Sequence, residues 1–443
     1  MLLSRYSILF DIEQNEFFIY NTLSNFLMEI DKESYSLLNI AQSSKLPIDI
    51  DKIDGELRKI LIDNRIIVEN DLDSFLLYKG AILNQRNDLN NFHLTLAPTM
   101  DCCFRCHYCF EKKKESKYMS NEVMCRIVNY VKQLKNQPDY HITWFGGEPL
   151  MAVNEMRTLY NLLVTEYKEP TYSNIITTGF HIDSTVIECL KSIKVSQIQI
   201  TLDGLKESHN KIKFVDGCDD VFTKVLNNIE LLFKESDIHV IIRVNLTKLN
   251  AQEYSQLYKS LLERFGKYQK IGIAPAFVLD RGSCEMRHKD CLFNTREIAD
   301  FIIDLYEKEG IHTPQLLYPS PYFNECAIRN PLSISFDPEG YAYKCWEHIG
   351  NEEYCFGQLN NNGKLNITNL TLLNRHLYGA DQLESNKCIQ CTYLPICNGG
   401  CPLQRIENLC EGHSETNCSI YRYSIIQLLK FHISAKRKLY TIK

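Results

Sequence analysis

Three cysteines in the stretch MDCCFRCHYCFE have the type and spacing needed to hold an iron-sulfur cluster. Cys102, Cys106 and Cys109 follow a Cx3Cx2C pattern. A cubane [4Fe-4S] cluster takes thiolate ligands, and three thiolates from one short loop leave the fourth iron open to a small molecule. A zinc site or buried thiols would use the same residues, and Cys103 offers a rival Cx2Cx2C pattern. Soft thiolate ligands at this spacing favour the cluster, and an open iron is a reaction site.

A second candidate element is the run WFGGEP, in which Gly146 and Gly147 precede Glu148. Glycine has no Cβ, so two in succession allow the backbone to approach a ligand closely. Taken alone, a Gly-Gly pair is more often ordinary loop punctuation. Its place after an apolar run is what makes it a candidate for binding.

The elements that must position these residues are strands of a parallel sheet. Apolar strand-like runs alternate with helical patterns, at 93–99, 140–145, 174–180, 197–204, 238–246 and 271–277. Such alternation predicts βα units. Six units fall short of the eight in a closed TIM barrel, so we expect an α/β fold with a partial (β/α)6 barrel and chemistry at the carboxyl ends of the strands. The cysteine loop follows the first strand.

The first predicted helix shows the apolar stripe expected of a core-facing helix, at Val123, Ile127, Val128, Val131 and Leu134. These five residues are assigned to the core and not to the site.

Polar residues lie at the ends of the later strands. Thr177 and Thr178 end the third run, and alternate positions of the fourth carry Gln199, Thr201 and Asp203. Period-two spacing places the last three on one face, where buried polar groups need hydrogen-bond partners. A bound ligand, solvent or neighbouring side chains would each supply them.

The two ends of the chain differ from this middle part. Residues 1–92 begin with three short strand-like runs followed by helical patterns starting near Asp31 and Asp51, which indicate a small winged-helix-like domain. Residues 310–443 are irregular and rich in cysteine, so we expect metal to stabilise their core. The predicted domains are therefore 1–92, 93–309 and 310–443.

The cysteines beyond residue 310 recur in an ordered pattern. They are Cys326, Cys345, Cys388, Cys391, Cys397, Cys401 and Cys418. From spacing alone, zinc and iron fit equally well.

Composition excludes several classes of protein. The 443 residues are 44% hydrophobic and 23% charged, which is typical of a globular protein. A net charge of -6 argues against nucleic acid as the default partner. No apolar run is long enough for a membrane span, so we expect a cytoplasmic protein without a membrane partner. In a reducing cytosol, 18 cysteines indicate metal or clusters more than disulfides.

The cysteine loop and the GGE run together resemble the radical S-adenosylmethionine enzymes. The resemblance implies that the open iron binds S-adenosyl-L-methionine, that Tyr108 packs near the adenine, and that Gly146, Gly147 and Glu148 contact the amino group. It also implies cofactor contacts from Thr178, Gln199, Thr201 and Asp203. Relatives often carry HDxxR after the fourth strand, whereas Lys213 stands at the arginine position here. Lys213 or Arg243 would therefore bind the carboxylate, with Asn245 as a further candidate.

The C-terminal cysteines are similar to the SPASM extension of such enzymes, which usually houses two auxiliary [4Fe-4S] clusters. The resemblance implies one cluster on Cys388, Cys391, Cys397 and Cys418, and a second on Cys326, Cys345 and Cys401. Some relatives have a further cysteine where Ser320 stands, so the second cluster has an open iron or borrows Cys355. Cys410 is a lower-ranked substitute for Cys418.

The resemblance is strongest to the maturases of ribosomally made peptides. It implies a precursor peptide as substrate, an oxidative crosslink as product, and a reductase such as flavodoxin or ferredoxin as electron donor. The N-terminal domain is similar in size and order to a leader-peptide recognition domain, although a purely structural role fits equally well. Glu347 is the candidate catalytic base. The alternatives are an anaerobic sulfatase maturase, which the replacement of its usual aspartate by Trp346 disfavours, and a non-catalytic metal-stapled peptide-binding module.

Overall fold

The computed structural model describes residues 1–12, 15–106, 108–109, 111, 114–279, 289–312, 314–410 and 418–441. The chain divides into two compact units, each assembled from separate segments. The barrel unit contains residues 88–294 and 327–377, and the flanking unit contains 1–87, 295–326 and 378–443. The three-domain division at residues 92 and 309 stays a prediction.

The barrel unit is built on six parallel strands that pair in sequence order. They are β6 (Asn91–Leu96), β7 (Asp139–Trp144), β8 (Tyr172–Thr177), β9 (Gln197–Leu202), β10 (His239–Leu246) and β11 (Ile271–Phe277). All six predicted strands are therefore present, and the predicted α/β fold is confirmed. Their side chains alternate in burial, as in β9, where Ile198, Ile200 and Leu202 are fully buried and face the helices.

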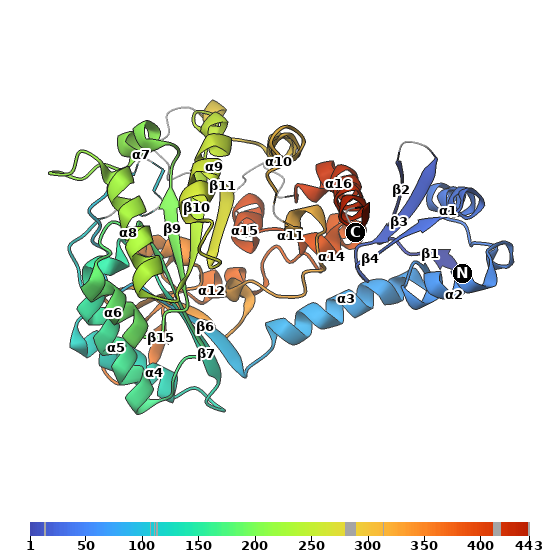
Figure 1. Cartoon of the computed structure of the whole chain (residues 1–443). Helices are drawn as coiled ribbons and strands as arrows, with labels where there is room; N and C mark the ends of the chain where they lie inside the picture. The colour runs from blue at the N-terminus through green and yellow to red at the C-terminus, as the bar shows by residue number, and fades with distance from the viewer. Residues whose placement is uncertain are drawn as a thin grey trace. The chain divides into compact units, whose positions relative to one another are not determined.

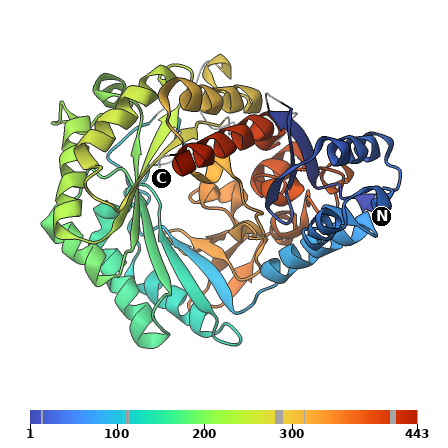
Figure 2. The same cartoon turned by 45° about the vertical axis from the view of Figure 1, so that its right-hand side comes forward.

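The helices that connect these strands lie along the outer side of the curved sheet (Figure 2). They are α4 (Asn121–Lys132), α5 (Val153–Glu166), α6 (Ser184–Ser192), α7 (Lys206–Ile212), α8 (Val221–Glu235) and α9 (Tyr254–Phe265). In α4, the predicted stripe from Val123 to Val131 is buried. Leu134 lies beyond the end of that helix and is half-buried.

Four short strands extend the sheet beyond the six predicted. They are β12 (Ile334–Phe336), β13 (Tyr341–Tyr343), β14 (Gly357–Leu359) and β15 (Leu365–Ile367), followed by α12 (Leu370–Tyr378). β12 pairs in parallel with β6, and the rest add in antiparallel order. Phe336 and Tyr343 are buried in this extension. The expectation that metal makes the core beyond residue 310 is thus wrong for this part, because ordinary sheet packing forms it.

The flanking unit begins with a small sheet and three helices (Figure 1). β2 (Ser7–Ile12), β3 (Glu16–Asn21) and β4 (Phe26–Ile30) form an antiparallel sheet in that order, and β1 (Leu2–Leu3) pairs with β5 (Ile67–Val68). The helices are α1 (Lys32–Ser44), α2 (Gly55–Asp63) and α3 (Asp71–Arg86). α1 begins next to Asp31 as expected, with Asp31 as its N-terminal cap, whereas α2 begins four residues after Asp51, because Asp54 provides its N-terminal cap.

Both faces of the small sheet are covered within this unit. Ile19 and Ile30 pack against Leu38 of α1 and Leu61 of α2. The opposite face packs on the helix α16 (Tyr421–Thr441) through residues such as Leu429. The remaining helices are α10 (Thr295–Glu309), α11 (Pro314–Leu317), α13 (Asn386–Ile389), α14 (Leu394–Cys397) and α15 (Pro402–Cys410). In the described part of the chain, no helix is both long and apolar enough to cross a membrane.

Candidate active site and cluster sites

The three cysteines of the Cx3Cx2C loop line one cavity of the barrel unit. This cavity has a volume of about 290 Å³, and the loop enters it directly after β6. Cys102 is buried, whereas Cys106 and Cys109 are half-buried. The wall also includes residues that lie within the other strands or just beyond their carboxyl ends: Gly146, Gly147, Thr177, Thr178, Gln199, Thr201, Arg243, Asn245 and Phe277. The cavity therefore lies at the carboxyl ends of the strands, as predicted.

The loop has the donor set that an iron-sulfur cluster requires. Burial raises the pKa of the Cys102 and Cys106 thiols to about 11, so iron must displace their protons on binding. Among the described residues, no group of three or more histidines, cysteines or carboxylates is placed to hold a single metal ion. The thiolates of a cubane each bind a different iron and need not converge on one point. The three soft donors on one cavity wall fit a cluster.

Lys114 and Glu111 also line this cavity, and neither was predicted from the sequence. Lys114 Nζ donates to Cys109 Sγ at 3.3 Å and pairs with Glu111 at 3.5 Å. Burial opposes the charge of Lys114, but the neighbouring thiol and carboxylate outweigh it and raise its pKa. The sequence places Lys114 in the run EKKKES, which resembles a solvated charge cluster. Nothing in that pattern marks which lysine contacts the cysteine.

The two glycines of WFGGEP pack against the backbone of the cysteine loop. A Cβ on Gly146, whose φ is +112°, would lie 2.4 Å from the carbonyl oxygen of Thr99. A Cβ on Gly147 would lie 2.1 Å from the carbonyl oxygen of Asp101. The two glycines thus permit a close approach to the chain itself, in addition to lining the cavity.

Glu148 is fully buried and is not among the residues that line the cavity. Its carboxylate accepts hydrogen bonds from the Thr177 hydroxyl, from the amide and hydroxyl of Thr178, and from the amide of Leu150. The side chain therefore fixes the end of β8 next to the second strand. The cofactor contact expected from this motif stays a prediction.

Asp203 and Lys213 form a buried ion pair behind the cysteine loop. Asp203 Oδ2 lies 3.1 Å from Lys213 Nζ, and Asp203 Oδ1 accepts a hydrogen bond from Tyr108. Burial would raise the pKa of Asp203, but Lys213, His209 and Tyr108 together hold it below its usual value. Burial and Lys213 lower the pKa of His209 to about 4, so its imidazole is neutral and accepts the Asp203 amide. Lys213 lines the cavity, whereas Asp203 is not among the lining residues and contacts Lys213.

The remaining predicted cofactor contacts line the same cavity. Tyr108, Thr178, Gln199, Thr201 and Arg243 all contribute to its wall. Arg243 Nε donates to Asn245 Oδ1 at 3.2 Å. Both alternative carboxylate partners are therefore at the cavity. Their contact with a cofactor stays a prediction.

Glu347 and Trp346 line the cavity from the segment after β13. Burial lowers the pKa of Arg243, and the charge of Glu347 opposes that effect, which places the carboxylate in electrostatic contact with the guanidinium. The Trp346 ring stacks on Phe145, with centroids 6.0 Å apart and planes 23° apart. Glu347, the candidate base, is thus at the cavity beside an aromatic pair.

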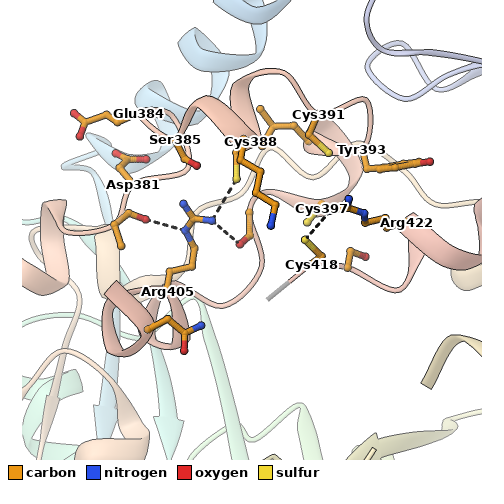
Figure 3. Close-up of a pocket in the computed structure, with 16 residues that line it drawn as sticks. Asp381, Glu384, Ser385, Cys388, Cys391, Tyr393, Cys397, Arg405, Cys418 and Arg422 are labelled. Atoms are coloured by element: carbon orange, nitrogen blue, oxygen red, sulfur yellow. Dashed lines mark hydrogen bonds between the residues drawn. The ribbon is translucent and has the colours of Figure 1, made fainter. Parts of the chain in front are cut away.

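Four of the C-terminal cysteines line a second cavity, within the flanking unit. Cys388, Cys391, Cys397 and Cys418 surround a space of about 680 Å³ (Figure 3). They come from α13, from the loop after it, from α14, and from the segment before α16. All four are half-buried. Four soft donors on one cavity fit the predicted auxiliary cluster.

The second predicted auxiliary set is divided between the two units. Cys326 is exposed and Cys401 directly precedes α15, both in the flanking unit, whereas Cys345 precedes the turn Trp346–His348 in the barrel unit. Cys355 Sγ donates to the carbonyl of Gly357 at 3.0 Å. A shared site for these cysteines stays a prediction.

The other thiols match no motif. Cys189 is fully buried in α6, as expected of a packing residue. Cys125 is exposed on α4. Cys284 lies outside the described residues, and Cys410 ends α15 with a side chain that is not described.

Comparison with known proteins identifies the class. Residues 96–261 match the family described as the Radical SAM superfamily. That range contains the cysteine loop, the glycine pair and the strands β7 to β10, whose ends line the cavity. Residues 96–261 are therefore a radical SAM domain, and the chain that carries them is an enzyme.

Particular relatives cover more of the chain. It is 24% identical to the radical SAM cyclopropyl synthase TigE of Paramaledivibacter caminithermalis over 90% of this chain and 89% of TigE. It is 22% identical to a cysteine-type anaerobic sulfatase-maturating enzyme of Clostridium novyi over 75% of this chain and 93% of that one.

Two solved structures share the fold. The structure named native anSMEcpe with bound AdoMet has a TM-score of 0.57 and 19% identity, covering 78% of this chain and all of that one. Streptococcus suis SuiB bound to S-adenosylmethionine has a TM-score of 0.50 and 16% identity, covering 90% of this chain and 95% of SuiB. At such identities these likenesses establish the fold.

Proposed function

We propose that this protein is a radical S-adenosylmethionine maturase that closes an oxidative crosslink, a thioether or a carbon-carbon bond, in a ribosomally made precursor peptide. The observation that carries the proposal is the single cavity shared by Cys102, Cys106 and Cys109, the glycine pair and the polar ends of β8 and β9. TigE, whose name describes a cyclopropyl synthase, is similar over most of both chains. This similarity supports carbon-carbon bond formation over the thioether.

The cavity offers two chemically different sets of lining residues to its ligands. The cysteines, Gly146, Gly147 and Thr178 suit a polar cofactor held by thiolate-bound iron and backbone groups. The other lining residues include an apolar set that suits a peptide side chain: Phe145, Ile176, Phe277, Val278, Leu279 and Trp346. With both bound, the cluster and cofactor supply a 5'-deoxyadenosyl radical, and the chain orients the peptide toward it.

The proposed reaction is a two-electron oxidation of the peptide. One hydrogen atom leaves a side chain or α-carbon and becomes part of 5'-deoxyadenosine. A second proton and electron leave as the new bond closes. Glu347 is our candidate acceptor for the proton because its carboxylate is in the cavity wall. The auxiliary cluster proposed for Cys388, Cys391, Cys397 and Cys418 is our candidate for the electron.

We assign recognition of the leader peptide to the small N-terminal sheet. Both faces of this sheet are covered by helices of the flanking unit, so its edges are what remains for a partner. β2 and β4 are the outer strands, and β4 is the less buried of the two. An extended leader would add a strand to β4 through main-chain hydrogen bonds.

A sulfatase maturase is the second candidate, supported by the similarity to the Clostridium novyi enzyme. Trp346 argues against it, because an indole cannot perform the acid-base role of the aspartate expected after Cys345. The two functions differ in their product, since formylglycine is a side-chain aldehyde whereas a crosslink is a new bond between two positions of the peptide.

The test is an anaerobic reaction with S-adenosylmethionine, a reductase of the flavodoxin or ferredoxin type, and candidate precursor peptides sought among the short open reading frames next to the gene. We expect a peptide lighter by two hydrogen atoms, with deuterium from a labelled peptide appearing in 5'-deoxyadenosine. Conversion of a sulfatase-derived cysteine peptide to formylglycine, with the precursor left unchanged, would favour the second candidate. Cofactor cleavage without any peptide product would contradict both.

A further inference from the structure

Two arginines donate hydrogen bonds to sulfur atoms of the second cysteine cavity. Arg405 Nη1 lies 3.3 Å from Cys388 Sγ, and Arg422 Nη1 lies 3.4 Å from Cys418 Sγ. Figure 3 shows the two guanidinium groups reaching the cysteines from different directions. Both arginines line the cavity but lie outside every cysteine motif.

The two arginines are held very differently. Arg405 is half-buried, and its guanidinium also donates to the carbonyl oxygens of Ala380 at 2.8 Å and Gly399 at 3.4 Å. These bonds fix its planar fork so that Nη1 remains on Cys388. Arg422, by contrast, is exposed near the start of α16. The same contact to sulfur is therefore rigid and partly shielded in one case and solvated in the other.

Such contacts act on the electron affinity of a cluster. The potential of an iron-sulfur cluster depends on its net charge, on hydrogen bonds to its sulfurs and on solvent exposure. Reduction adds one negative charge, so a cationic donor stabilises the reduced state more than the oxidised state. That stabilisation is larger where the local dielectric is low, which makes the half-buried arginine the stronger influence.

We infer that Arg405 raises the reduction potential of a [4Fe-4S] cluster bound by Cys388, Cys391, Cys397 and Cys418, and that Arg422 does so more weakly. The inference rests on the auxiliary cluster that the proposed function assigns to these four cysteines. Arg405 is a positioning residue that acts through the Cys388 sulfur. Its effect poises the oxidised cluster to take up the single electron that leaves the peptide when the crosslink closes.

The test is a redox titration of the full chain, followed by electron paramagnetic resonance. Cys102, Cys106 and Cys109 are replaced by alanine so that the remaining signals belong to auxiliary clusters. We expect Arg405→Gln to lower one midpoint potential by about 59 mV, which is a tenfold change in the reduction equilibrium for one electron. Arg422→Gln should lower the same midpoint by less.

Lys387→Gln is the matched control. Lys387 lines the same cavity, and no hydrogen bond from it to a sulfur is found among the described residues. Its replacement removes the same positive charge without removing a contact to the cluster, so the midpoint should move less than in Arg405→Gln. Arg405→Lys keeps the charge without the planar fork, and should give an intermediate midpoint even if Arg405→Gln fails to hold iron.

Two outcomes would overturn the inference. An unchanged midpoint in both Arg405 variants at full iron content would show that the contact does not tune the cluster. An equal shift in Lys387→Gln would show that only the total charge of the cavity matters. If Cys388→Ala loses no iron, the proposed cluster itself is wrong, which iron analysis distinguishes from a failure of tuning.

Discussion

The backbone amide of Glu148 donates a hydrogen bond to the carbonyl oxygen of Asp101 at 2.7 Å, which joins the end of the second strand to the cysteine loop. The preceding amide, that of Gly147, donates to Thr99 at 3.1 Å. The two hydrogen bonds hold the cysteine loop against the segment that follows β7. Cys102, a proposed cluster ligand, is the next residue after Asp101, so its position depends on this contact.

Gly147→Ala should therefore displace the cysteine loop, because the new Cβ would lie 2.1 Å from the Asp101 carbonyl oxygen. We expect loss of about four irons per chain and loss of cofactor cleavage, measured by iron analysis and 5'-deoxyadenosine formation. Gly80→Ala is the control, because a Cβ there meets nothing within 4 Å in the middle of α3. It should stabilise the helix by about 1 kcal/mol. Full activity in Gly147→Ala would contradict the steric argument.

Lys213→Met should leave the buried carboxylate of Asp203 unpaired and destabilise the fold by about 3–5 kcal/mol at pH 7. The pKa of Asp203 is lowered in the folded wild type, so the ion pair stabilises the fold at pH values above about 3.9, the pKa of an aspartate in the unfolded chain. This stabilisation is lost as the pH falls through the pKa of Asp203 in the folded protein. In the variant, the largest effect that opposes burial is removed, so burial raises that pKa. The loss of unfolding free energy caused by Lys213→Met should therefore become smaller between pH 7 and pH 5, because the Asp203 carboxyl becomes protonated.

Urea unfolding at the two pH values measures this difference. Lys206→Met is the control, since Lys206 is well exposed and its partner Asp220 is only half-buried, and the loss should stay below about 1 kcal/mol. A loss of unfolding free energy in Lys213→Met that becomes larger toward pH 5 would contradict the assigned protonation states.

Trp346→Ala should separate cofactor cleavage from peptide modification. The indole stacks on Phe145, and both rings line the cavity, so the loss of the indole should lower product formation about tenfold. Cleavage of S-adenosylmethionine should continue, and Trp346→Phe should retain most of the product. Equal losses of both activities in Trp346→Ala would show that the ring supports the cofactor site instead of the peptide.

Leader peptides methylated at single backbone nitrogens should bind with an alternating pattern of affinity. A peptide that adds a strand to β4 directs every second amide toward it, and each lost hydrogen bond should weaken binding about threefold to tenfold. Fluorescence anisotropy with the full chain measures the effect. A uniform effect along the leader, or none at all, would contradict strand addition to the edge of this sheet.

The six barrel strands could be predicted because each is a run of six to eight residues with clear apolar patterning. β12 to β15 have three residues each, too few to show a period, and only their pairing beside β6 makes them strands. The helix α16 was also missed, although Ile425, Leu428 and Leu429 have helical spacing, because the region was interpreted as irregular.

The site was predictable where spacing along the chain determines the chemistry, as for Cys102, Cys106 and Cys109. Contacts that depend on how separate segments fold together were not predictable. Lys114 and Arg405 reach cysteine sulfurs only because of how their segments fold. The buried position of Glu148 likewise depends on the neighbouring strand, which no local pattern encodes.

The most direct test of the radical mechanism is an anaerobic assay of iron and 5'-deoxyadenosine on the reconstituted full chain with S-adenosylmethionine and dithionite. We expect about twelve irons per chain, for three clusters of about four each, together with cofactor cleavage. Cys102→Ala should lose about four irons and all cleavage, whereas Cys125→Ala, which alters an exposed thiol of α4, should keep both. Zinc in place of iron, or cleavage that persists in Cys102→Ala, would contradict the account.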